Sequence, residues 1–360
     1  MRPPRALRLL ATGLLALAAV PTWSAANPCE AGAQRPTVVR TERVRQGLSV
    51  VARVRSGVQP KSVEITPDGA QAWVCNFGRP RGDNVTIHDS ETLERIGAVE
   101  FQGNAVETTF DPNGRYAYVS NFAAHAIEVI DRETFEVVRE VVVGGHPKVM
   151  AIAPGGRRMY VANWGTHQVT EIDLTTFEIR RRLRTGEHPR GMAIARGGQR
   201  IFVAAMYSHV IHVFDRGASR ERTSFHPCDF PRHLLLSPDE QRLYASCSCC
   251  RQVRWFDTTD YRLRGIAQTG ENPRTIALSR DGRWLAVADF DDSTVGWIDT
   301  QALTHHVVPV PDADQIVGVA IRNPRTDGEL PRVYATSWNS GELIALEPPH
   351  PAPAEPADTP

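Results

Sequence analysis

The sequence predicts an all-β fold, a seven-bladed β-propeller of four-stranded antiparallel blades. Three observations predict it: a repeat of constant period, four strand-like stretches in each repeat, and turn residues between those stretches. The period is 42 residues and is marked by aspartates that each end an apolar alternating stretch: Asp89, Asp131, Asp173, Asp215, Asp257 and Asp299. A period of about 40 residues with four strands per unit is typical of propeller blades rather than helical solenoids.

One complete repeat, Gly144 to Gly186, shows the four expected strands. It contains the stretches VMAIA, MYVAN, VTEID and IRRRL, which are rich in residues that favour strands. The turn sequences PGG, NWGT and DLTT separate them, as tight connections between antiparallel strands require. Seven repeats are present, and we expect their innermost strands to begin near Pro60, Ala105, Pro147, Pro189, Pro231, Pro273 and Ile316.

The last repeat lacks a fourth strand, because Pro348 and Pro349 follow its third stretch at once. Residues 48–55 (LSVVARVR) have a strand pattern but belong to no repeat, so we expect them to pair with the last blade and close the ring. The propeller then covers residues 48–347. An N-terminal extension, 27–47, precedes it, and the Pro-rich residues 348–360 are expected to be disordered.

Residues 1–26 have the pattern of a signal peptide. Arg2, Arg5 and Arg8 precede an apolar run at 9–20, and small residues at 24–26 provide a cleavage site. That run is too short to span a bilayer. We therefore expect a periplasmic or secreted protein with no membrane span, in a compartment that permits disulfides.

The motifs YVAN at 160–163, YVSN at 118–121 and the G-x-x-P loops resemble the repeats of the YVTN-type β-propeller family. That family includes periplasmic and surface-layer propellers and is similar to the haem-binding propeller of dissimilatory nitrite reductase. The resemblance implies the fold strongly and no single activity, because these motifs are structural. The similarity to nitrite reductase implies one alternative function, a haem- or metal-dependent oxidoreductase or haem-handling protein.

A set of cations occupies one position of the repeat. We call the end of the propeller at which the innermost strands begin the top face. The residue after the loop proline is a cation in five of seven repeats: Lys61, Lys148, Arg190, Arg232 and Arg274. We call these five residues the basic ring. Like charges around one opening repel each other unless water or an anion lies among them, so the ring predicts an anion-binding site. The alternative is a solvated rim without a ligand, inherited through duplication of the repeat.

Aromatic residues follow the second strand of most repeats and are expected on the same face. We call them the aromatic rim: Phe77, Phe122, Trp164, Tyr207, Phe290 and Trp338. Their rings could stack on a planar or sugar-like ligand, or simply pack against neighbouring loops. Four histidines of the same loops are candidate ligands of a metal or haem iron, although exposed histidines without a metal are commoner: His146, His167, His188 and His209.

The cysteines predict disulfides near this face. A hairpin that turns at 239–240 brings Cys228 close to Cys249 and Cys250, so we expect a bridge from Cys228 to one of them. A thiolate metal cluster with His226 is the alternative. A second bridge could join Cys29 to Cys75, although sequence cannot settle the connectivity.

These observations predict a binding protein that captures an anionic ligand or partner on its top face. We expect an anionic small molecule, a glycan or an acidic protein segment as its partner. With 41 basic and 41 acidic residues, the chain is not expected to bind nucleic acid. We assign no catalytic residue and expect a monomer. We identify no cofactor; haem or a transition metal is an alternative that the sequence does not favour. A structural propeller of the cell envelope is a further alternative.

Overall fold

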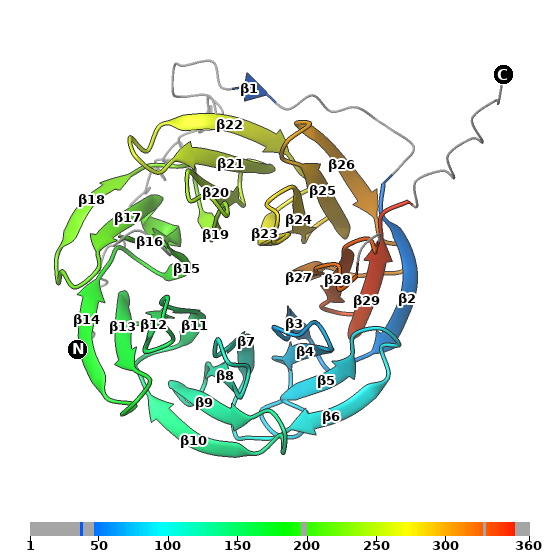
Figure 1. The fold of residues 1–360 in the computed structure, drawn as a ribbon, viewed down its shortest axis with the longest axis horizontal. Coiled ribbons are helices and arrows are strands. Elements are labelled where there is room, and N and C mark those ends of the chain that lie inside the picture. The colour runs from blue at the N-terminus through cyan, green and yellow to red at the C-terminus, as the bar shows by residue number, and fades with distance from the viewer. Residues whose placement is uncertain (1–36, 39–46, 196–199, 327–328, 350–360) are drawn as a thin grey trace, which may run out of the picture. The chain divides into compact units, whose positions relative to one another are not determined.

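The computed structural model describes residues 37–38, 47–195, 200–326 and 329–349. Contacts divide the chain into residues 1–33 and residues 34–360, and all described residues belong to the second unit. In that unit seven sheets with four antiparallel strands each surround a common axis (Figure 1). The predicted seven-bladed β-propeller is confirmed. The predicted signal peptide and nearly all of the predicted extension and tail lie outside the described residues.

Each blade runs from the axis outward in chain order. Blades 1 and 2 consist of β3 (Pro60–Ile65), β4 (Gln71–Asn76), β5 (Val85–Asp89), β6 (Arg95–Val99), β7 (Ala105–Phe110), β8 (Tyr116–Asn121), β9 (Ala126–Asp131) and β10 (Val137–Val142). Blades 3 and 4 consist of β11 (Pro147–Ile152), β12 (Arg158–Asn163), β13 (Gln168–Asp173), β14 (Ile179–Arg184), β15 (Pro189–Ile194), β16 (Arg200–Ala205), β17 (Val210–Asp215) and β18 (Glu221–Phe225).

Blades 5 and 6 consist of β19 (Pro231–Leu236), β20 (Arg242–Cys247), β21 (Gln252–Asp257), β22 (Leu263–Gln268), β23 (Pro273–Leu278), β24 (Trp284–Asp289), β25 (Thr294–Asp299) and β26 (Thr304–Pro309). Blade 7 consists of β27 (Ile316–Arg322), β28 (Arg332–Ser337), β29 (Glu342–Glu347) and β2 (Ser49–Arg55). The innermost strands therefore begin at the residues that the repeat predicted.

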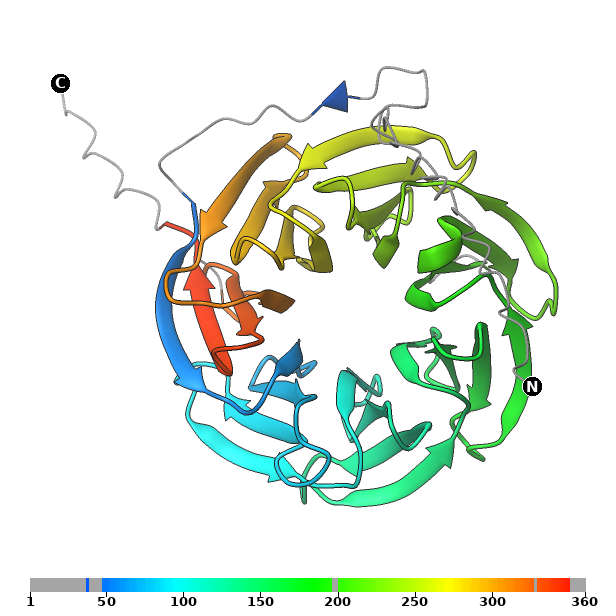
Figure 2. The same ribbon diagram turned by 180° about the vertical axis from the view of Figure 1, so that it is seen from behind.

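The ring is closed by β2, which comes from the N-terminal side of the propeller. It pairs antiparallel with β29 and supplies the strand that the last repeat lacks. This joining of the two chain ends removes the free sheet edge that each would otherwise present. The closed ring is visible from both sides (Figure 2). An additional short strand, β1 (Thr37–Val38), pairs in parallel with β22 at the outside of blade 5.

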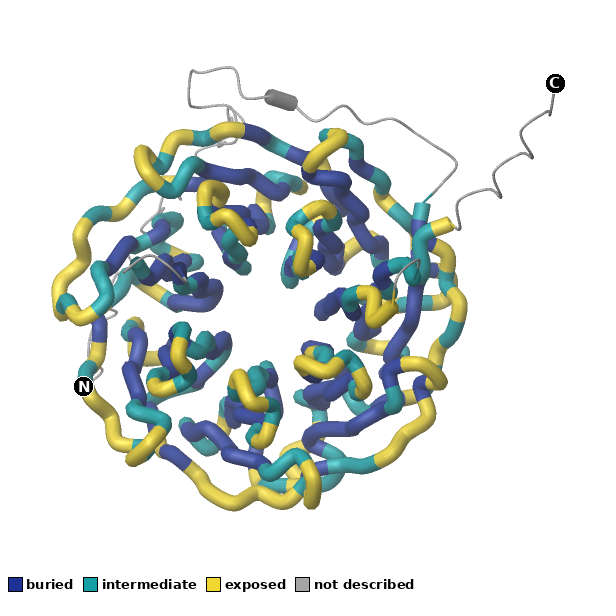
Figure 3. The backbone as a smooth tube through the Cα atoms, viewed as in Figure 1, coloured by how far each residue is buried: buried dark blue, intermediate teal, exposed yellow. Residues whose placement is uncertain are grey.

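Burial follows the position of a strand within its blade. The second strand of each blade is almost wholly buried, whereas an outer strand such as β10 is mostly exposed (Figure 3). Apolar side chains of neighbouring blades pack together, so that Trp73 of blade 1 and Val119 of blade 2 share one core cluster. The described residues contain one helical turn, the 3₁₀ segment Met206–Ser208. No helix in the described part of the chain is long and apolar enough to cross a membrane.

Candidate functional site

The five cations of the basic ring each lie at the top of an innermost strand. Each follows the proline that begins β3, β11, β15, β19 or β23, and in all five strands the pairing register shifts directly after that proline. Such a bulge changes the direction of the side chains at the irregular position, and bulges are frequent next to functional sites. The repeat therefore presents the same bulged position to the axis in five blades.

In the part of the chain that the structure describes, no acidic side chain lies within bonding distance of these cations. The side chains of Lys61 and Arg190 are buried, with exposed fractions of only 7% and 6%. Among the described residues, none of the five side chains forms an ion pair or a hydrogen bond, and the buried Nε atoms of Arg232 and Arg274 have no partner. Buried charged groups are normally paired and hydrogen-bonded. The ring therefore has unfilled donor capacity.

The cations also lie close enough to repel each other. Burial lowers the pKa of Lys61 well below its usual value, and the charges of Arg190, Lys148 and Arg232 lower it further. The pKa of Lys148 is well below its usual value for the same reasons, burial first. Burial also lowers the pKa of Arg274, to about 9, with Arg190 contributing. A bound anion would relieve this repulsion.

Aromatic rings contact three of the five cations. Lys61 Nζ lies 5.3 Å from the ring centroid of Trp338. Lys148 Nζ lies 4.9 Å from the Phe122 centroid and 5.2 Å from that of Trp164. A ring face attracts a cation without neutralising its charge. These members of the aromatic rim therefore hold the basic ring in place, a role that the sequence did not suggest.

The remaining members of the rim extend this layer around the top face. Phe77 lies between Phe122 and Trp338, at centroid distances of 5.7 and 5.8 Å. Tyr207 contacts His188 at 4.6 Å and is 47% exposed. Phe290 is buried beneath Arg274. Ring contacts thus connect Trp338 with Tyr207 through Phe77, Phe122, Trp164 and His188, whereas Phe290 contacts Arg274 alone among these groups.

The histidines of these loops make structural hydrogen bonds. In three pairs of residues 21 positions apart, the backbone N–H of the later residue donates to the imidazole Nδ1 of the earlier histidine. The pairs are His146 with His125, His188 with His167, and Phe230 with His209, at 3.1, 3.1 and 3.0 Å. His188 also stacks on Trp164 at a centroid distance of 4.0 Å. No group of three or more His, Cys, Asp or Glu side chains among the described residues is arranged to hold a metal ion. The metal or haem-ligand role stays a prediction.

The cysteine pairing differs from the prediction. Cys228 forms a disulfide with Cys247, at a Cα–Cα distance of 5.9 Å, so a bridge from Cys228 to Cys249 or Cys250 is wrong. Pro231 lies opposite Cys247 at the end of the β19–β20 hairpin, and the left-handed backbone of Phe230 (φ 52°) turns the preceding chain, so the hairpin register does not extend to Cys228. Counting residues about the hairpin turn could not show this change of direction. The disulfide also removes the Cys228 thiol from the proposed thiolate cluster with His226.

The second predicted bridge is also wrong. Cys75 is a free thiol, fully buried in β4, with its Sγ 3.1 Å from Thr108 Oγ1. Burial raises the pKa of this thiol to about 12. Cys29, its predicted partner, lies outside the described residues. Cys249 is free and exposed, and Cys250 is disulfide-bonded.

Comparison with known proteins supports the architecture. A family model described as "Lactonase, 7-bladed beta-propeller" matches residues 57–226. The chain is a β-propeller. The solved structure of Kuenenia stuttgartiensis hydrazine synthase is similar to it, with a TM-score of 0.69 and 18% identity over 83% of this chain and 98% of that chain. No curated protein matches the chain. At this identity the likeness shows the fold alone, and membership of the YVTN-type family stays a prediction.

Three ionisable residues near the axis were missed by the sequence analysis. Glu107 and His233 are the third residues of β7 and β19, one position below the level of the basic ring, and Glu64 is the fifth residue of β3. Burial raises the pKa of Glu107, whereas the charges of four cations of the ring act to lower it. Burial also lowers the pKa of His233 to about 4, and enclosure by the surrounding blades raises that of Glu64 to about 8, although Glu64 is exposed toward the axial opening. The sequence signal that could have identified these three residues is an ionisable side chain inside an otherwise apolar inner strand.

Proposed function

We propose that this protein binds a small multivalent anion at the top-face end of the propeller axis, with the basic ring as its binding site. One observation carries the proposal: five clustered cations with no ion-pair partner among the described residues. Glu107 is the acid whose charge acts on four of them. Asp291 acts on the fifth, Arg274. Two carboxylates cannot balance five cations, so the site retains a positive potential that favours an anion.

The ring offers two kinds of donor. A guanidinium binds carboxylate or phosphate oxygens through two parallel N–H donors, whereas an ammonium acts as a compact point charge. Arg190, Arg232 and Arg274 follow one another in blades 4 to 6, and Lys61 and Lys148 complete the ring in blades 1 and 3. This arrangement suits a ligand with at least two anionic groups, one of them held by the arginines.

Burial favours a small ligand over a glycan or an acidic protein segment. Lys61 and Arg190 are more than nine-tenths buried, so a folded partner could reach them only through a narrow extension. Beside Arg232 a cavity of about 430 Å³ opens between blades 4, 5 and 6, and Tyr207 and Phe230 line it. The matched family model is named for lactonases, which makes a lactone with a carboxylate or phosphate group one specific candidate.

The proposed location is the periplasm or the extracellular space. The Cys228–Cys247 disulfide is compatible with an oxidising compartment, where such bonds persist. The predicted signal peptide at residues 1–26 supports the same location. Fractionation of the native host, with detection of the mature N-terminus by mass spectrometry, tests both predictions.

Calorimetric titration with citrate and with inorganic phosphate tests the binding function. We expect citrate to bind more tightly and both affinities to fall several-fold between about 50 and about 200 mM NaCl, because salt screens the attraction. Arg190→Ala and Arg232→Ala should each weaken citrate binding about 10- to 100-fold, the effect of losing a charge-assisted hydrogen bond. Arg220→Ala, which removes an exposed charge far from the ring, is the matched control. Salt-independent binding, or unchanged affinity in both ring variants, would contradict the proposal.

A further inference from the structure

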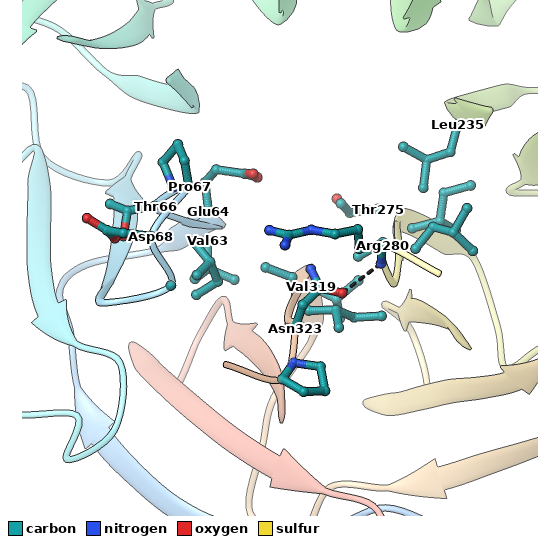
Figure 4. Close-up of a pocket in the computed structure, with 18 of the residues that line it drawn as sticks. Val63, Glu64, Thr66, Pro67, Asp68, Leu235, Thr275, Arg280, Val319 and Asn323 are labelled. Atoms are coloured by element: carbon teal, nitrogen blue, oxygen red, sulfur yellow. Dashed lines mark hydrogen bonds between the residues drawn. The ribbon is translucent and has the colours of Figure 1, made fainter. Parts of the chain in front are cut away.

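A second cavity opens at the opposite end of the axis, which we call the bottom face. It has a volume of about 340 Å³ and is lined by inner strands and loops of blades 1, 2, 5, 6 and 7 (Figure 4). Glu64 projects from β3, and Arg280 projects from the loop between β23 and β24. Glu107 and His233 lie in the wall of the same cavity. The basic ring does not line it, so this cavity is distinct from the site proposed above.

Two charged groups at this opening already have partners. Asp68 accepts a charged hydrogen bond from Arg132 at 3.0 Å, and Arg325 pairs with Glu91 at 2.9 Å. Glu64, Glu107 and Arg280 differ, because within the described residues none of these side chains forms an ion pair or a hydrogen bond. Glu107 is under the charge of four cations of the basic ring, which leaves Glu64 as the carboxyl group and Arg280 as the guanidinium available to a ligand in the cavity.

These two groups approach the cavity from different walls. The Arg280 backbone N–H donates to Asn323 Oδ1 at 2.6 Å, which ties its loop to blade 7. From this anchored position the Arg280 side chain extends across the cavity toward the wall that carries Glu64 (Figure 4). A ligand between them would meet a cation on one side and a carboxyl group on the other.

An apolar wall continues from the same point. A neighbouring cavity of about 330 Å³ shares Leu235, Leu278 and Arg280 with the first. Its further lining includes Ile152, Met192, Ile194 and Leu234. The bottom-face opening is therefore polar toward blades 1 and 7 and apolar toward blades 3 to 5. Apolar surface beside a few convergent polar groups is the usual composition of a small-molecule site.

We propose that this bottom-face cavity binds an apolar α-amino acid. Arg280 binds the carboxylate, Glu64 binds the ammonium group, and the side chain of the ligand lies on the wall formed by Leu235 and its apolar neighbours. A ligand with only one charge would leave either Glu64 or Arg280 without a partner. A ligand without an apolar group would leave the wall beside Leu235 exposed to water.

The protonation of Glu64 gives the proposal a second consequence. Glu64 is exposed toward the opening, but enclosure by the surrounding blades and the charge of Glu107 raise its pKa to about 8, which favours the protonated carboxyl group in the empty cavity. An ammonium group beside it favours the carboxylate, and binding should therefore release a proton. The charged and titratable groups that share the cavity with Glu64 are Asp68, Glu107, His233, Arg280 and Arg325.

Calorimetric titration of the full chain with three probes tests the assignment of each group. L-Leucine carries both charges, 4-methylpentanoate lacks the ammonium group, and 3-methylbutylamine lacks the carboxylate. We expect leucine to bind most tightly. Arg280→Gln should weaken leucine and 4-methylpentanoate at least about tenfold and leave the amine unchanged, whereas Glu64→Gln should weaken leucine and the amine and leave the acid unchanged.

Two further measurements separate this proposal from the anion site. Titration in buffers of different ionisation enthalpy should show a proton released on leucine binding by the wild type but not by Glu64→Gln. Arg190→Ala should bind leucine like the wild type, since it lies at the other end of the axis. No saturation by leucine at about 10 mM, or unchanged leucine affinity in both cavity variants, overturns the proposal.

Discussion

The guanidinium carbon of Arg274 lies 3.0 Å from the centroid of the Phe290 ring, the shortest contact between a cation and a ring among the described residues. Arg274 follows the proline that begins β23, and Phe290 follows the last residue of β24, so the two lie at the top of neighbouring strands. The ring face attracts the guanidinium but leaves its charge intact. The pair thus shows how this fold keeps a cation near its axis without an acidic partner.

Phe290→Leu should destabilise the protein by about 1–2 kcal/mol, because leucine keeps most of the apolar bulk but has no π face for Arg274. Urea denaturation with intact disulfides measures the change. Arg274→Gln and the double variant complete a thermodynamic cycle that isolates the coupling of the two side chains. A coupling energy near zero would mean that the contact does not hold Arg274.

The architecture was predictable because each blade repeats the same local chemistry. Proline starts most innermost strands and glycine or aspartate marks the turns, so the residues at which these strands begin follow directly from the 42-residue period. The missing fourth strand of the last repeat likewise indicated the role of β2. The period, the turn residues and the missing strand can each be found by counting residues or by inspecting a short segment of the sequence.

The details of the site were less predictable because they depend on irregular pairing and on contacts between blades. The chain turns at Phe230, between Cys228 and the first residue of β19, and Cys228 meets Cys247 rather than Cys249. The rings of the aromatic rim contact cations across blade boundaries, as Lys61 of blade 1 meets Trp338 of blade 7. Backbone angles in the loops and the packing of neighbouring blades do not follow from counting residues within one repeat.

The double variant Cys228→Ala/Cys247→Ala should lose about 3 kcal/mol of stability, the usual effect of opening a disulfide loop of this length. Denaturant unfolding measures the loss. Cys249→Ala is the matched control and should change stability by less than about 0.5 kcal/mol, because this exposed thiol is free. If the Cys249 variant is the destabilised one, the pairing described above is incorrect.

Thiol labelling provides an independent test of the same connectivity. In the native protein an alkylating reagent should modify the exposed Cys249 well before Cys75. The Cys75 thiol is buried and hydrogen-bonded to Thr108. After unfolding without a reductant, Cys75 should become reactive as well. Peptide mapping identifies the two sites, and native-state labelling of Cys228 or Cys247 would contradict the structure.

Glu91 joins the first blade to the last at the bottom face. It pairs with Arg322, Arg325 and Arg332 at 3.0, 2.9 and 3.0 Å, and the Arg322 side chain is only 3% exposed. Glu91→Gln should cost about 1–2 kcal/mol, less than a wholly buried pair, because Glu91 itself is 49% exposed to solvent. Glu94→Gln, an exposed glutamate of the same loop, should change thermal stability little. Equal effects of the two variants would show that this network does not secure the ring closure.

The raised pKa of Glu64 predicts how stability depends on pH. In the unfolded chain a glutamate loses its proton near pH 4.3, whereas folded Glu64 keeps it until its pKa of about 8. Between these values the folded state binds more protons than the unfolded state, so stability falls as the pH rises. Glu64→Gln should therefore gain stability relative to the wild type as the pH rises from about 5 to about 8, whereas the exposed-site control Glu133→Gln should not. Chemical denaturation at several pH values measures both differences, and parallel profiles for the wild type and Glu64→Gln would show that Glu64 ionises normally.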